Sequence, residues 1–370
     1  MKLAATILII CVAILLALGT VMLFSSPVGA PLLSKQLFWC ALGLVACVGV
    51  NLVDYQHLKK IAWPLLIFTG VMLVLVLIPH VGTWRGGARR WFNLGFMLFQ
   101  PSEFAKLVLL IAVAHYGDRF QRRMPNFKQG LAWPAAFIAP LLLLMIVEPD
   151  YGTTLLLAAV SAVMLLVAGA RLKHVAIISV LGVVVVGLSI WHNPIRLARI
   201  MDFINGTGYQ SSQSIIALGS GGWTGVGLGD GRQKLGYVPE NHTDFILSII
   251  GEELGLVATL SVVVLFVTIV ICGIFIASNA RDRFGFLLAT GLTFLIGLQA
   301  FINIGVVSGA LPNKGLALPF VSYGGSSLVM MLAAIGLLLN VARHGEVAVR
   351  VGGRRINPFN PANIPSTQLP

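Results

Sequence analysis

The chain has 370 residues, of which 57% are hydrophobic and 10% are charged. In soluble domains about 45–50% of residues are hydrophobic and about 25% are charged. A soluble chain of this length could not bury so much apolar surface in its core, so the composition predicts a polytopic membrane protein. Long Leu, Val, Ile and Ala runs favour an all-α fold over an outer-membrane barrel. The net charge of +12 favours anionic membrane lipids, and not nucleic acid, as a partner.

Ten apolar stretches are long enough, or nearly so, to cross a bilayer, which takes about 20 helical residues. We expect one membrane domain over 1–342 and a basic, disordered cytoplasmic tail over 343–370. The segment 192–243 is too long for a simple connection and should form a large extracytoplasmic loop between spans seven and eight. The ten stretches are 4–24, 37–53, 61–80, 101–117, 130–148, 151–170, 174–191, 250–277, 284–306 and 321–342.

The distribution of Lys and Arg predicts the orientation. If both termini are cytoplasmic, the inner segments hold fifteen of the 25 cations and the outer segments hold nine, with Lys106 inside a span. Cytoplasmic loops are rich in cations, so this bias predicts two cytoplasmic termini in the cytoplasmic membrane. Seven of the nine outer cations lie in the loops 81–100 and 192–243, which indicates an anionic ligand at the outer face.

The loop 81–100 combines arginines with glycines and with Trp84 and Trp91. The planar fork of arginine suits a phosphate, and tryptophan rings suit the level of the lipid headgroups. Phosphate capture and simple headgroup anchoring both explain this composition.

Glu103 and Lys106 follow Pro101 at the start of the fourth stretch. Their i,i+3 spacing places them on one helix face. A charge at membrane depth costs about 2.5–3.5 kcal/mol on insertion scales, so these charges should be paired or line a wet cavity. The two residues could form a structural ion pair or the wall of a polar site, and the sequence is compatible with both interpretations.

Two kinds of site are disfavoured. The glycine-rich run from Gly219 has no Gly-Lys-Ser/Thr ending and no preceding strand, so it is not a nucleotide loop. The four cysteines lie inside apolar stretches and form neither a disulfide framework nor a metal motif. No ligand cluster demands a metal, although a divalent cation (Mg or Mn) could assist an anionic reaction.

Asp244 lies where the outer loop enters the eighth stretch. If the chain is helical from there, Asp244, Ser248, Gly251 and Glu252 form one polar stripe. Partial desolvation would raise the pKa of Asp244 and suit it to accept a proton near neutral pH. Helix capping is the alternative, because Asp is a favoured N-cap residue.

Near the C-terminus, Lys314 is a further outward cation. It is followed by Gly324-Gly325-Ser326-Ser327, a run of small residues that permits close approach of helices.

Taken together, and in their order along the chain, these segments resemble the SEDS family (shape, elongation, division and sporulation), which includes FtsW, RodA and SpoVE. Lys314 within Leu-Pro-Asn-Lys-Gly is similar to the FtsW branch. The matching pieces are 87–91, 99–103, 148–153, 233–234, 239–246, 252–255 and 318–327.

The resemblance implies a peptidoglycan glycosyltransferase that polymerises lipid II at the outer face of the membrane and releases undecaprenyl pyrophosphate. It implies a class B penicillin-binding protein as partner, within a division or elongation complex. Asp244 matches the catalytic aspartate of the family. The candidate substrate-binding residues are Arg90, Glu103, Lys106, Arg199, His242, Lys314 and Ser322.

The implied reaction makes a β-1,4 bond from an α-linked donor. It needs a base for the acceptor hydroxyl, which is Asp244, and cations for the leaving pyrophosphate. A lipid II flippase and a non-catalytic scaffold for the penicillin-binding protein are the alternatives. A flippase needs a polar path through both leaflets, whereas the extra cations here concentrate outside.

Overall fold

The computed structural model describes residues 1–26, 29–85, 87–95 and 98–352. Each of the ten predicted stretches coincides with a helix, which confirms the all-α membrane fold. These helices are α1 (Lys2–Phe24), α2 (Gly29–Leu52), α3 (His57–Leu77), α4 (Pro101–Arg119), α5 (Trp133–Val147), α6 (Tyr151–Val167), α7 (Leu172–Trp191), α10 (Ile246–Ser278), α11 (Arg283–Val307) and α12 (Gly325–Gly352). Short 3-10 and π turns, η1 (Gln121–Arg123) and η2 (Lys128–Ala132), connect α4 to α5.

Eight helices in the described part of the chain are long and apolar enough to cross a membrane. The remaining two of the ten are α6, which has 17 residues, and α4, which carries charged residues at both ends. Helix α4 is buried along most of its length and packs against α3, α6 and α11. The most polar of the ten helices is therefore shielded from lipid by its neighbours.

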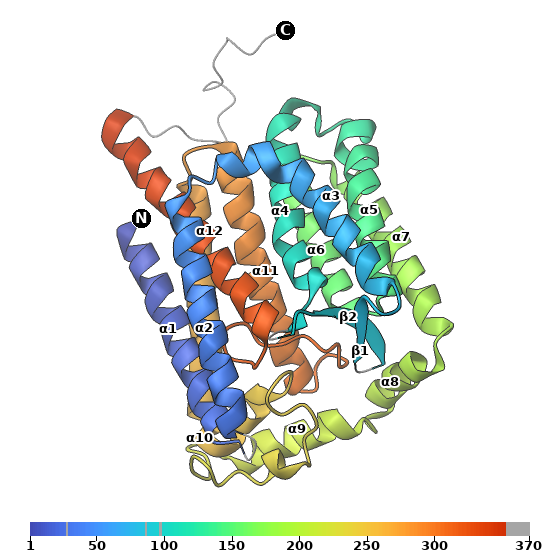
Figure 1. Cartoon of the computed structure of the whole chain (residues 1–370), viewed down its shortest axis with the longest axis vertical. Helices are drawn as coiled ribbons and strands as arrows, with labels where there is room; N and C mark the ends of the chain where they lie inside the picture. Colours follow the sequence, from blue (N-terminus) through green and yellow to red (C-terminus); the bar gives the residue numbers. More distant parts are fainter. Residues whose placement is uncertain (27–28, 86, 96–97, 353–370) are drawn as a thin grey trace.

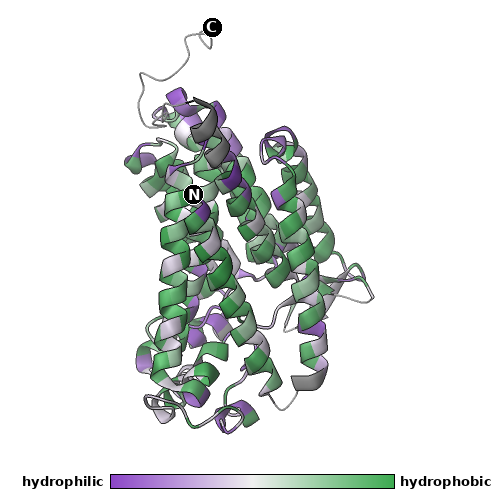
Figure 2. Ribbon diagram, turned by 90° about the vertical axis from the view of Figure 1, so that its left-hand side faces the viewer, coloured by the Kyte–Doolittle hydropathy of each residue, from purple (hydrophilic) through white to green (hydrophobic). Residues whose placement is uncertain are grey.

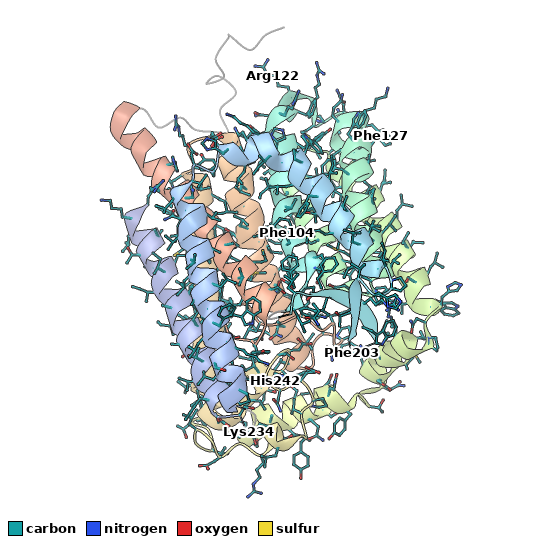
Figure 3. The ribbon with its side chains drawn as sticks, in the orientation of Figure 1. Phe104, Arg122, Phe127, Phe203, Lys234 and His242 are labelled. Atoms are coloured by element: carbon teal, nitrogen blue, oxygen red, sulfur yellow. The ribbon has the colours of Figure 1, made fainter. Side chains whose placement is uncertain are left out.

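The helices run between two ends of the molecule (Figure 1). The N-terminus and the C-terminal end of α12 lie at one end, and the described parts of 81–100 and the segment 192–243 lie at the other. Hydrophobic positions dominate the helices between these ends (Figure 2). Arg122 lies at the end with the termini, whereas Lys234 and His242 lie at the opposite end (Figure 3). The two cation-bearing loops thus share one end, as their composition predicted.

Both long segments at this end of the molecule are structured. The first forms an antiparallel sheet in the order β1-β2-β3, which adds a small β element to the all-α prediction. The second contains two amphipathic helices and a 3-10 turn, so it is more than a connection. These elements are β1 (Gly82–Arg85), β2 (Ala88–Asn93), β3 (Leu98–Phe99), α8 (Pro194–Asn205), α9 (Tyr209–Ser220) and η3 (Gln233–Leu235).

Helix α10 begins four residues before the predicted stretch and is broken inside. Gly255 has φ 77° and ψ −176°, a conformation open to glycine and strained for other residues. A break inside a membrane helix exposes backbone groups that must find partners. The amides of Leu256 and Val257 donate to Gly222 and Trp223, at 2.9 and 3.3 Å.

The glycine-rich run from Gly219 also provides hydrogen-bond donors for the carbonyls that the break leaves free. The amides of Val226 and Gly227 donate to the carbonyls of Glu252 and Glu253, at 2.9 and 3.1 Å. A Cβ atom on Gly225 would lie 2.1 Å from the carbonyl oxygen of Glu253. The run is glycine-rich because its backbone packs directly on the broken helix.

The C-terminal helix α12 differs from the predicted span at both ends. It begins at Gly325, where a Cβ atom would lie 2.3 Å from the ring of Trp39 on α2. That contact confirms the close approach expected of Gly325. The helix continues to Gly352, so the first part of the expected tail is helical, and 353–370 lie outside the described residues.

Candidate active site

Asp244 lies in a turn just before α10. The helix starts at Ile246 with Phe245 at its N-cap, so the expectation that Asp244 caps the helix is wrong. The expected polar stripe starting at Asp244 is wrong for the same reason, because Asp244 precedes the helix. No described residue donates a hydrogen bond to its carboxylate, whereas its backbone oxygen accepts one from Asn303 at 2.7 Å.

Burial raises the pKa of Asp244 to about 7, and the nearby carboxylates of Glu240 and Asp150 raise it further in the same direction. An aspartate with this pKa is partly deprotonated at neutral pH and can accept a proton. Its environment therefore has the property that a general base requires.

Lys314 belongs to the segment that packs against Asp244. A Cβ atom on Gly315 would lie 3.4 Å from Oδ2 of Asp244, and one on Gly152 would lie 2.5 Å from the carbonyl oxygen of Lys314. Burial lowers the pKa of Lys314. No hydrogen bond or ion pair joins its ammonium to another described residue. The backbone segment of this half-buried cation, which is unpaired among the described residues, therefore packs against the Asp244 carboxylate.

Glu103 and Lys106 form an ion pair inside the bundle. Lys106 is 1% exposed, and its Nζ lies 2.9 Å from Oε1 of Glu103 and 3.0 Å from Oε1 of Gln299. The other oxygen of Glu103 is buried without a hydrogen-bond partner. Lys106 is thus bonded to protein atoms, which agrees with the interpretation of the pair as a structural ion pair. Gln299 links the pair to α11.

Arg90 contacts the turn between α5 and α6. Its Nε donates to the carbonyl oxygen of Glu148 at 2.8 Å, and its Nη2 donates to that of Pro149 at 2.7 Å. Two of its guanidinium nitrogens are therefore used to hold this turn. Both carboxylate oxygens of Glu148 are buried without a partner. Burial and the charge of Asp150 raise the pKa of Glu148 to about 8, against the opposing effect of Arg90.

Asp150 closes the same turn as the N-cap of α6. It accepts hydrogen bonds from the amide of Thr153 at 3.2 Å and from the hydroxyl of Ser102 at 2.9 Å. On α8, Arg196 lies 3.7 Å from the ring centroid of Tyr151. The predicted Arg199 is exposed on α8, and no recorded contact brings it to this turn. Of these two arginines, Arg196 is the one adjacent to α6.

His242 and Ser322 hold the turn that carries Asp244. The hydroxyl of Ser322 donates to the carbonyl of Thr243 at 2.6 Å and accepts from the amide of Leu318 at 2.8 Å. The carbonyl of His242 accepts from the amide of Tyr323 at 2.9 Å, and the two rings lie 5.9 Å apart. Both predicted residues thus join the Asp244 turn to the segment before α12.

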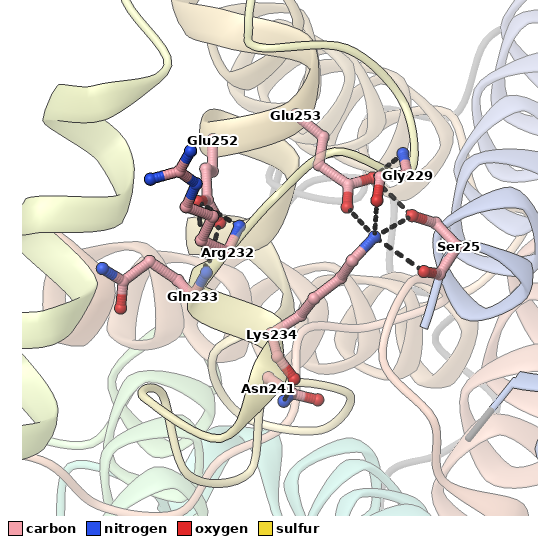
Figure 4. A network of polar contacts seen from close by, with 8 residues as sticks. All are labelled: Ser25, Gly229, Arg232, Gln233, Lys234, Asn241, Glu252 and Glu253. Atoms are coloured by element: carbon pink, nitrogen blue, oxygen red, sulfur yellow. Dashed lines mark hydrogen bonds and ion pairs between the residues drawn. The ribbon is translucent and has the colours of Figure 1, made fainter. Parts of the chain in front are cut away.

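A buried ion pair fixes the segment 192–243 next to this turn. Nζ of Lys234 lies 2.5 Å from Oε1 of Glu253, and it also donates to Ser25 at the end of α1 (Figure 4). The adjacent carboxylate of Glu252 accepts hydrogen bonds from the amides of Arg232 and Gln233 (Figure 4). The two glutamates that follow Gly251 therefore serve as anchors for the loop.

Sequence reasoning missed Asn303, Gln299 and Glu148 as parts of this site. Asn303 and Gln299 are polar residues one turn apart in an apolar helix, each 1% exposed, and that spacing was an available signal. Glu148 precedes Pro149 and Asp150 at the end of a span. Its burial could not be read from that position alone.

The bundle and the site together define a multi-pass α-helical membrane protein. At one end it has a desolvated carboxylate and a lysine that is unpaired among the described residues. A family model described as "Cell cycle protein" (FtsW/RodA/SpoVE) matches residues 5–347. The chain belongs to this family.

The similar proteins cover nearly the whole chain. A "Probable peptidoglycan glycosyltransferase FtsW" of Trichlorobacter lovleyi is 40% identical, over 94% of this chain and 95% of its own length. A solved structure from "Structural coordination of polymerization and crosslinking by a peptidoglycan synthase complex" has a TM-score of 0.78 and 30% identity, over 91% of this chain and 97% of that one. The rod shape determining protein RodA of Thermus thermophilus has a TM-score of 0.69 and 30% identity, over 91% and 95% of the two chains.

Proposed function

We propose that Asp244 is the general base of a peptidoglycan glycosyltransferase that polymerises lipid II at the outer face of the cytoplasmic membrane. The chain is an enzyme of this class, in cell-wall synthesis for division or cell shape, as the names of its relatives indicate. The observation that carries the assignment of the base is the Asp244 carboxylate, whose pKa is raised to about 7 and which packs against the segment that carries Lys314.

In the proposed reaction, Asp244 takes the proton from the 4-hydroxyl of the acceptor sugar. The freed oxygen attacks the anomeric carbon of the donor from the side opposite to the pyrophosphate. A β-1,4 bond forms, the bond to the α-linked pyrophosphate breaks, and undecaprenyl pyrophosphate leaves. One base and one leaving group on opposite faces of the sugar account for inversion.

Lys314 is our choice for the cation that stabilises the leaving pyrophosphate. Its ammonium is unpaired among the described residues, and its neighbour in the chain, Gly315, packs against the base. Arg90 and Lys106 already donate to protein oxygens, so we assign them to holding the site. A preorganised cation acts strongly in a partly desolvated site. No three His, Cys, Asp or Glu side chains of the described residues are grouped to hold a metal, so we assign charge neutralisation to the chain's own cations.

The orientation follows from the charge bias. Fifteen cations lie on the side of the termini, which we therefore place in the cytoplasm. Asp244 and Lys314 then open to the outer face, where the headgroup of lipid II is presented. We also propose a class B penicillin-binding protein as partner within a division or elongation complex, since a similar structure comes from a complex that couples polymerisation to crosslinking.

The test is polymerisation of purified lipid II by the purified protein, with and without its penicillin-binding partner. Glycan strands with the parent protein, and none with Asp244→Asn, are expected. Transfer of lipid II across vesicles without polymer would instead identify a flippase. Full activity of the partner with the Asp244→Asn protein would identify a scaffold.

A further inference from the structure

We propose that Gln299 and Asn303, two amides one turn apart on α11, are positioning residues that set the distance between Asp244 and Lys314. This inference deepens the proposed function and rests on it. Both residues are 1% exposed, so neither side chain is accessible to a substrate. They act through backbone carbonyls of the two segments that carry the reacting groups.

Asn303 joins the two segments directly. Its single amide nitrogen donates to the carbonyl of Asp244 and to that of Leu316, both at 2.7 Å. Leu316 is two residues from Lys314, so one side chain fixes the base and the cation relative to each other. The amide oxygen of Asn303 is buried without a partner. A buried acceptor left unsatisfied costs free energy, which is consistent with a side chain held for its two donor hydrogens.

Gln299 extends the connection to the buried ion pair on α4. Its Oε1 accepts from Nζ of Lys106 at 3.0 Å, and its Nε2 donates to the carbonyl of Ala317 at 2.8 Å. An ammonium only donates, so Lys106 fixes which end of the amide faces it and directs the NH2 group to Ala317. The Glu103–Lys106 pair thereby acts on the Lys314 segment through Gln299. This gives the buried charges of α4 a role without contact with substrate.

The decisive variants are isosteric. Asn303→Asp keeps the size of the side chain and replaces the two donor hydrogens by a carboxylate oxygen facing two carbonyls. Gln299→Glu likewise keeps the size of the side chain and replaces the donor to the carbonyl of Ala317 by a carboxylate oxygen. A misplacement of about 1 Å costs on the order of 10²-fold in rate. We expect kcat for lipid II polymerisation to fall by about that factor in Asn303→Asp, with KM little changed, because the loss concerns the reacting geometry.

Asn340 on α12 provides a matched control. It is also a fully buried asparagine, and its Nδ2 donates to the backbone carbonyls of Val50, Asn51 and Val53. Its partners belong to the end of α2 and the turn that follows it, and not to the segments that carry Asp244 and Lys314. Asn340→Asp should lower the melting temperature and leave kcat per folded molecule at the parental value. Asn303→Ser removes the amide without adding a charge and is measured as well, in case the aspartate variant does not fold.

Initial rates are measured over a range of lipid II concentrations for the protein in complex with its penicillin-binding partner. Parental kcat in folded Asn303→Asp or Asn303→Ser would overturn the inference. Equal loss of kcat in Asn340→Asp would also overturn it, because the effect would then be general destabilisation. A parent protein that makes no polymer would instead refute the proposed function.

Discussion

A Cβ atom on Gly315 would stand 3.4 Å from Oδ2 of Asp244, so the candidate base lies against the segment that carries the candidate cation. Gly315 has φ +65°, a conformation that disfavours other residues. A side chain at position 315 would stand against the carboxylate. The base and the segment of the cation are thus neighbours, although Lys314 follows Asp244 by 70 positions in the sequence.

Asp244→Asn should abolish polymerisation while leaving the fold intact. The carboxylate caps no helix and accepts no hydrogen bond from a described residue, so its loss removes no structural contact. Loss of a general base costs about 10²–10⁴-fold in rate. The measurement is glycan synthesis from lipid II, with thermal melting and partner pull-down as checks of folding. Asp230→Asn, at an exposed carboxylate of the same outer segment, is the control and should keep activity.

The pH dependence of the parent should show the raised pKa of Asp244. Activity should increase as pH rises through about 7, because the base works in its deprotonated form. Stability should change in the opposite direction, since the folded-state pKa exceeds the ordinary value of 3.8 and deprotonation of the folded protein is disfavoured. Above pH 7, Asp244→Asn should therefore melt at a higher temperature than the parent. Flat activity between pH 6 and 8 would contradict this assignment.

Lys314→Ala and Arg90→Ala should differ in their effect on stability. Lys314 has no partner among the described residues, so its loss should lower lipid II use and leave melting unchanged. A lost charge-assisted contact costs about 1.5–3 kcal/mol. Arg90→Ala should lower both lipid II use and the melting temperature, because it leaves two backbone carbonyls without their donor.

Arg90→Lys separates charge from geometry at this position. Lysine keeps the charge and lacks the fork that reaches both Glu148 and Pro149. It should melt like Arg90→Ala if holding the turn is the main role. Parental stability in Arg90→Lys would argue for a role of charge alone.

Gly255→Ala should destabilise the protein by more than about 1 kcal/mol. The new Cβ atom would lie 2.4 Å from the amide nitrogen of Gly225 and 2.5 Å from the carbonyl oxygen of Trp223. Gly70→Ala on α3 is the matched control, since nothing lies within 4 Å of its Cβ position. Alanine favours a helix over glycine by about 1 kcal/mol, so that variant should be neutral or more stable in thermal melting. Similar melting of the two variants would refute the role of the break.

Cysteine labelling in intact cells tests the orientation. In a variant without native cysteines, we expect an impermeant reagent to label Trp84→Cys and Tyr237→Cys, whose parent side chains are exposed in the segments 81–100 and 192–243. Arg122→Cys, near the termini, should react only after the membrane is opened. The reverse pattern would invert the topology and remove the site from the outer face.

The sequence by itself determined the bundle and the grouping of charge. Hydropathy is a local property, so ten apolar stretches identified ten helices, and Pro101 marked the start of α4. Four predicted spans lie between 81–100 and 192–243, and an even number of spans returns the chain to the same end, where both segments are found. The position of Asp244 at the edge of a span made it a candidate, and its match to the catalytic aspartate of the family singled it out.

The tertiary structure decided what each polar residue contacts. Lys106 meets Gln299 across 193 residues, and Arg90 meets Glu148 across 58. Such partners depend on how helices pack, and helix packing is not encoded in any local pattern. The break at Gly255 was also hidden, since its cost is offset by backbone groups of a distant loop. Hydrophobicity sets the helices one by one, whereas hydrogen-bond satisfaction in a low-dielectric interior selects their mutual arrangement.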